Sequence, residues 1–97
     1  MTTLIRNKFF WEISYIDDIN EIIIRYGKIG SIGTFFISSG YDSNEWEKEI
    51  DRKIKNKKKN DWIITNQQFI TKDKLIDLRF KLYDYQGNLK LPIKNIY

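Results

Sequence analysis

The residues of this chain best suited to a specific interaction form a short basic and aromatic segment, Arg25-Tyr26-Gly27-Lys28, and a cationic run from Arg52 to Lys59. A Tyr ring can stack on a sugar or base, and Lys or Arg can neutralise phosphate. The sequence contains neither Cys nor His. Disulfides, zinc–thiolate sites, thiol nucleophiles and the usual general base near neutral pH are therefore excluded. This inventory favours binding over catalysis, and we expect no catalytic residue, no metal and no cofactor.

Both segments also have a plainer interpretation, which the sequence leaves open. Tyr26 could simply pack at the end of a strand, because most strand aromatics belong to the core. The cationic run could be ordinary solvated surface, as most charge runs are. The net charge of +4 and the pI of about 9.3 give modest support to an anionic partner.

Two other motifs do not match the sites that they might suggest. The glycines of residues 27–33 lack the Gly-x-x-x-x-Gly-Lys-Ser/Thr pattern of a nucleotide-binding loop, so we interpret them as tight backbone turns. The acidic cluster at residues 17–20 lacks the spacing and the terminal Glu of a calcium-binding loop. We expect a solvated hairpin turn there.

The elements that position these residues follow from hydrophobic periodicity. Alternation predicts strands over residues 9–16, 21–26 and 34–38, and again over 78–85. Residues 62–70 could be extended or could include a helical turn. Residues 86–88 form a predicted turn, and 89–93 could pair back as an edge strand, since Pro92 cannot donate to a ladder.

One main helix is expected to begin near Asp42, where Glu45 three residues later fits a capping box. Trp46, Ile50 and Ile54 recur every fourth residue and give it one apolar stripe. The predicted fold class is therefore α+β: an antiparallel sheet of four to five strands with one main helix packed on one face. The 97 residues are expected to form a single domain, with a core over residues 8–85 and an extension over 86–97.

No run of the sequence approaches the roughly 18 apolar residues of a membrane helix. The N-terminus also lacks the apolar region of a signal peptide. We expect a soluble, intracellular protein that does not associate with membranes.

Residues 8–62 resemble a WGR domain, the module of DNA-dependent poly(ADP-ribose) polymerases and of assorted bacterial proteins. The signature Trp-Gly-Arg, followed by a hydrophobic residue and Gly, corresponds to Tyr26-Gly27-Lys28-Ile29-Gly30. The family's helix and its basic stretch ending in Asn-x-Trp correspond to the predicted helix and to Asn60-Asp61-Trp62. Tyr26 and Lys28 depart from the signature but keep its chemical classes, although Lys lacks the bidentate fork of Arg.

The resemblance implies a non-catalytic nucleic-acid-binding module for duplex DNA ends or nicks, with DNA favoured over RNA. Tyr26 would stack on a sugar, while Lys28 and Arg25 would supply charge beside Gly27. A basic patch on the helix would extend the footprint; its residues are Lys53, Lys57, Lys58 and Lys59. The alternative is a protein–protein interaction adaptor that binds no DNA. A small enzyme would have to use carboxylates, Tyr or Lys, and nothing in the sequence arranges them for that purpose.

Overall fold

The computed structural model describes residues 1–42 and 44–90 of the chain. Its centre is one antiparallel sheet with the strand order β4-β3-β2-β1-β5. The strands are β1 (Thr2–Arg6), β2 (Phe9–Ile16), β3 (Glu21–Lys28), β4 (Thr34–Ser39) and β5 (Ile63–Thr65). The predicted α+β class is confirmed, and so are the strands predicted over residues 9–16, 21–26 and 34–38, which are β2, β3 and β4. A short 3-10 helix, Asp17–Ile19, makes the predicted turn between β2 and β3.

The sequence analysis missed β1 and left β5 open. Strand β1 lies between β2 and β5. Its adjacent residues Thr3 and Leu4 point to opposite faces of the sheet, and both are buried, so the strand is covered on both faces. A short strand buried on both faces shows no apolar–polar alternation from which it could be recognised.

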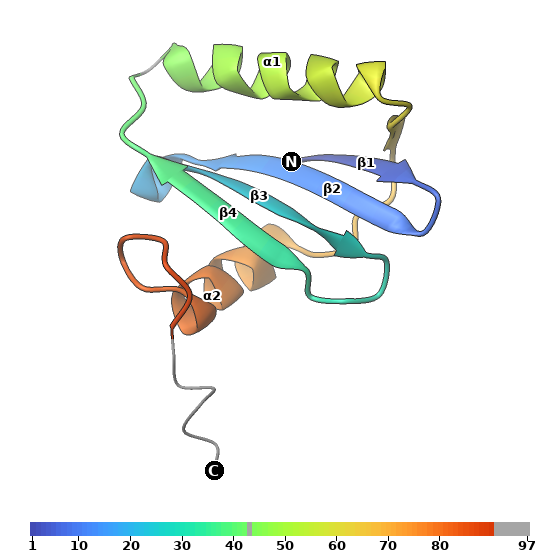
Figure 1. Ribbon diagram of the computed structural model, residues 1–97. Helices are drawn as coiled ribbons and strands as arrows, with labels where there is room; N and C mark the ends of the chain where they lie inside the picture. The colour runs from blue at the N-terminus through green and yellow to red at the C-terminus, as the bar shows by residue number, and fades with distance from the viewer. Residues whose placement is uncertain (43, 91–97) are drawn as a thin grey trace.

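Helix α1 (Glu45–Lys59) covers one face of the sheet (Figure 1). The helix begins at Glu45, three residues after Asp42, and its N-cap is Asn44, which makes no side-chain capping bond. Asp42 is therefore not the capping residue that the sequence analysis expected, although its backbone N–H donates to the Glu45 carboxylate at 3.0 Å. The predicted stripe of Trp46, Ile50 and Ile54 packs against the core of this face. That core comprises Leu4, Trp11, Ile13, Ile22 and Ile24.

The strand predicted over residues 78–85 is wrong, because most of this segment belongs to helix α2 (Lys72–Leu82). Leu75, Leu78 and Arg79 are its buried residues, and their spacing of three and four marks one helical face. The Thr71 hydroxyl caps the helix by accepting from the Lys74 N–H at 3.2 Å. The alternation of apolar residues over 78–85 had suggested a strand, and the helical spacing appears only over the longer segment that includes Leu75.

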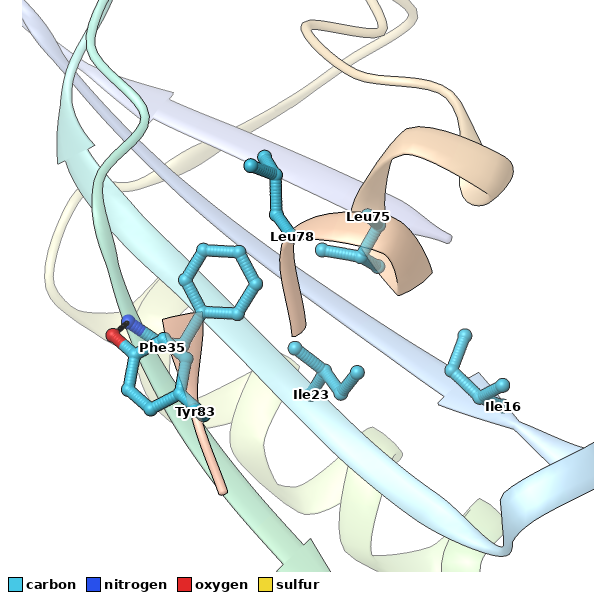
Figure 2. Packing of buried hydrophobic residues seen from close by; sticks show 6 residues of the cluster. All are labelled: Ile16, Ile23, Phe35, Leu75, Leu78 and Tyr83. Atoms are coloured by element: carbon cyan, nitrogen blue, oxygen red, sulfur yellow. Dashed lines mark hydrogen bonds between the residues drawn. The ribbon is translucent and has the colours of Figure 1, made fainter. Parts of the chain in front are cut away.

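Helix α2 covers the face of the sheet opposite α1 (Figure 1), so a second helix accompanies the main one. Figure 2 shows the core between α2 and the sheet, where the Tyr83 hydroxyl accepts a hydrogen bond from the Phe35 N–H at 3.1 Å. The other members of this core are Ile16, Ile23, Leu75 and Leu78.

After α2 the chain turns at residues 86–88 as predicted, and Tyr83 forms an isolated bridge with Leu89. Residues 91–93 of the predicted edge strand, including Pro92, lie outside the described residues, as does most of the predicted extension. No helix in residues 1–42 and 44–90 has the length and apolar character needed to cross a membrane.

Candidate nucleic-acid interface

A groove of about 430 Å³ lies between the end of the sheet and the C-terminal end of α1. The signature contributes Tyr26 and Gly27 to it, and α1 contributes Lys57. The rest of the lining is aromatic: Phe9, Phe10, Trp11 and Trp62. The signature and the basic helix are far apart in the sequence, and the structure brings both to one groove.

Tyr26 lies where the cover of α1 ends. It pairs with Trp11 across β3 and β2, and directly opposite residues of an antiparallel pair share a face. Trp11 is 5% exposed beneath the helix, whereas Tyr26 is 44% exposed. The Tyr26 ring is therefore open to a ligand, and it is not the buried strand-end residue of the plainer interpretation.

Lys28 continues the same face toward the rim of the groove. Its partner across the ladder is Phe9, which is 51% exposed. Lys28 is exposed as well. The residue pair Lys28 and Phe9 thus adds a cation and a second open aromatic ring beside Tyr26.

Lys57 lies between two tryptophans at the end of α1. Its Nζ is 5.4 Å from the centroid of the Trp11 ring and 5.3 Å from that of Trp62, within the range of cation–π attraction. The Arg6 guanidinium lies 5.8 Å from the Trp62 ring and donates to the Asn60 carbonyl at 2.9 Å. These contacts hold the end of the helix and Trp62 against the sheet.

The loop after Lys28 is shaped by Gly33, whose φ of 83° lies in the left-handed region. A Cβ at this position would lie 2.7 Å from the carbonyl oxygen of Tyr26. The Ser31 hydroxyl donates to the Lys28 carbonyl at 2.7 Å and tightens the turn. The signature therefore rests on a close backbone approach that only glycine permits.

Arg25 lies on the opposite face of the sheet from Tyr26, and it is 2% exposed. Its guanidinium pairs with the Glu12 carboxylate at 3.1 Å and donates to the Ile32 carbonyl at 2.8 Å. It also lies over the Phe10 ring, 4.4 Å from the centroid. Arg25 thus holds the loop from beneath, and its charge does not face the groove.

The predicted patch on α1 divides into three parts. Lys57 lines the groove, Lys58 and Lys59 are exposed at the end of the helix, and Lys53 lies 3.9 Å from the Glu49 carboxylate. The helix end combines these cations with the partial negative charge of its carbonyls, an arrangement that stabilises the helix. A structural reason for the lysines therefore exists beside any binding role.

The sequence analysis assigned none of Phe9, Trp11 and Trp62 to the binding site, yet all three line the groove. Trp11 is buried there. The sequence carried one signal for Trp62, its place in the Asn60-Asp61-Trp62 pattern directly after the lysine run. No sequence signal placed Phe9 in the groove, because the exposure of Phe9 depends on where α1 ends.

The described part of the chain contains no group of three or more acidic or other metal-ligating side chains that could hold a metal ion. The residues that line the groove offer aromatic stacking surfaces and positive charge.

Comparison with known proteins gave one result. Residues 3–69 match the family model of the WGR domain, a range that begins in β1 and ends at Phe69, before α2. No curated protein and no solved structure gave a significant match. WGR is a non-catalytic domain family known in nucleic-acid-binding contexts. Because the match covers more than half of the chain, this protein belongs to the WGR domain family.

Proposed function

We propose that this protein binds nucleic acid, with the ends or nicks of duplex DNA as its target, through contacts to sugars and phosphates. One observation carries the proposal: the open Tyr26 ring of the signature and Lys57 of the basic helix line the same groove. A stacking surface beside positive charge is the combination that a nucleic-acid strand requires.

In this proposal the Tyr26 ring packs against a sugar that is exposed where the duplex is interrupted. Gly27 lets the strand approach the backbone, and Lys28 and Lys57 neutralise the nearby phosphates. Lys58, Lys59 and Lys53 extend the footprint along α1. Arg25 takes part indirectly, since its hydrogen bond to the Ile32 carbonyl supports the loop that follows Lys28.

Such contacts position a protein without reading the sequence, so we expect little sequence preference. Roughly three to five neutralised phosphates would give a log–log salt slope of about −3 to −5. The preference for DNA over RNA and for ends over continuous duplex rests on the family resemblance, and both are open to direct test.

The test is fluorescence polarisation with intact, nicked and 5′-phosphorylated-end duplexes of DNA, and with a matching RNA duplex, over a salt series. We expect tighter, salt-sensitive binding to nicked and end-bearing DNA. Lys28→Ala should weaken it at least about tenfold at low salt, and Tyr26→Ala at least about fivefold.

Two matched variants on the other side of the molecule serve as controls. Lys81→Ala removes one exposed charge from α2, and Tyr85→Ala removes a ring that is 88% exposed beyond α2. Both should bind like the wild type. Unchanged affinity in Lys28→Ala and Tyr26→Ala would exclude the assigned site.

A protein-interaction adaptor is the second candidate, and a specific surface favours it. Ile32 and Phe36 are 53% and 55% exposed on the glycine loop and on the edge strand β4, and Ile29 is 39% exposed. Large apolar side chains that are exposed on an edge strand and on the loop leading into it are candidate contacts for a protein partner. Salt separates the candidates, since phosphate binding collapses as salt rises and an apolar interface does not.

A further inference from the structure

The groove contains more aromatic surface than the packing of one sugar on Tyr26 requires. Phe9 and Trp62 form further walls, and Trp11 lies beneath them. The groove has a volume of about 430 Å³, which lies within the range of roughly 300–1,000 Å³ typical of small-molecule sites. A ligand group that enters it can contact several rings together, which a backbone sugar on the surface cannot do.

The charge of the groove restricts what that group can be. Among the described residues that line it, none is acidic, and Lys57 is the charged one. Lys28 adds a second cation at the rim, opposite Phe9. Cations at the site disfavour a positively charged ligand, and aromatic walls favour a flat one. A base with its own phosphate meets both conditions, and every base offers a π-face whatever its sequence.

Bases inside a duplex keep both faces stacked, so they cannot enter such a groove without being extruded. An unpaired base avoids most of that cost. We propose that the groove takes an unpaired base beside the duplex end, so that the preferred target is a DNA end with a short single-stranded overhang. This inference rests on the proposed function and specifies the ligand of the same site.

The experiment compares three DNA ends in the polarisation assay at one salt concentration: blunt, with an overhang of about three nucleotides, and with the same overhang made of abasic nucleotides. The abasic strand keeps the phosphates and sugars and removes only the bases. Stacking of a base on aromatic side chains corresponds to roughly five- to 150-fold in affinity. We therefore expect the overhang with bases to bind at least about fivefold more tightly than the abasic one.

Phe9→Ala tests the same contact from the side of the protein. Phe9 is 51% exposed, so its removal should leave the fold intact, and the control Phe36→Ala removes a ring that is 55% exposed on β4, outside the groove lining. Phe9→Ala should lower the affinity for the overhang with bases to that for the abasic overhang, so that the two overhangs bind alike. Phe36→Ala should preserve the difference between them.

The outcomes separate this inference from the proposed function. Equal affinity for the two overhangs, with duplex binding retained, would overturn the inference and leave the function standing. Binding of a single-stranded oligonucleotide that depends on Phe9, without binding to any duplex end, would support the base groove and overturn the duplex-end function. No binding to any nucleic acid would overturn both.

Discussion

The two faces of the sheet use charge in opposite ways. On the α2 face, two arginine–glutamate pairs are buried, Arg25 with Glu12 at 3.1 Å and Arg79 with Glu21 at 2.7 Å. On the α1 face the core is aliphatic and aromatic, and the cations gather at its open end beside Tyr26. The first face is closed and supports the fold, while the second ends in a groove.

The contrast teaches that proximity in the sequence is a poor guide to a shared site. Arg25 and Tyr26 are adjacent, yet successive side chains of a strand point to opposite faces. Tyr26 therefore faces the groove, and Arg25 enters the core behind it. Lys57, far along the chain, is the cation that shares the groove with Tyr26.

Breaking an arginine–glutamate pair on the α2 face should have the largest effect on stability. Arg79 is fully buried and donates to both oxygens of the Glu21 carboxylate, so Arg79→Ala leaves an unpaired buried charge. We expect the free energy of unfolding to fall by about 3–5 kcal/mol, measured by urea denaturation.

Two controls make this prediction specific. Lys81→Ala, on the exposed side of the same helix, should change stability by less than about 1 kcal/mol. Replacing both Arg79 and Glu21 by apolar residues of similar volume should restore much of the loss, because no charge is then left unpaired. If Arg79→Ala lowered the free energy of unfolding by no more than Lys81→Ala does, the structural role of the Arg79–Glu21 pair would be contradicted.

An intermediate effect on stability is expected at the loop between β3 and β4. Gly33→Ala would place a Cβ 2.7 Å from the Tyr26 carbonyl oxygen, in a left-handed conformation. We expect a loss of about 1–3 kcal/mol in the free energy of unfolding, together with weaker DNA binding. Gly30 has a comparable positive φ of 98°, but a Cβ there would meet nothing within 4 Å. Gly30→Ala should therefore cost clearly less, and equal losses would show that the close approach is unimportant.

The smallest effect on stability should come from the groove itself. Lys57→Met keeps the apolar stem between Trp11 and Trp62 and removes the charge. We expect thermal unfolding to report a loss of roughly 0.5–1 kcal/mol, while the salt slope of DNA binding falls by about 1. A large loss of stability with an unchanged slope would assign Lys57 to the fold and not to the interface.

Much of the architecture was predictable from local pattern. Period-two alternation identified the hairpin of β2 and β3, and the four-residue spacing of Trp46, Ile50 and Ile54 identified α1. The family was also readable from the segment around Tyr26-Gly27-Lys28, and the WGR match confirmed it. These features need only the residues of one segment and their order, which the sequence contains in full.

Other features depended on contacts between distant segments. The C-terminal half of helix α2 was predicted as a strand, since Leu78, Phe80 and Leu82 alternate with other residues over a short span. The helical spacing becomes visible only when Leu75 is included. Contacts with the sheet resolve the ambiguity: Glu21 of β3 pairs with Arg79 of the helix, and the Phe35 N–H of β4 donates to the hydroxyl of Tyr83, the residue directly after the helix. The point at which α1 ends above the strands likewise decides two features of the groove. It leaves Phe9 and Tyr26 exposed, and it places Lys57 between two tryptophans.

The sequence alone determined the family and most of the elements through local periodicity. The tertiary structure decided which side chains are buried and which line the groove, because burial depends on residues far away in the chain.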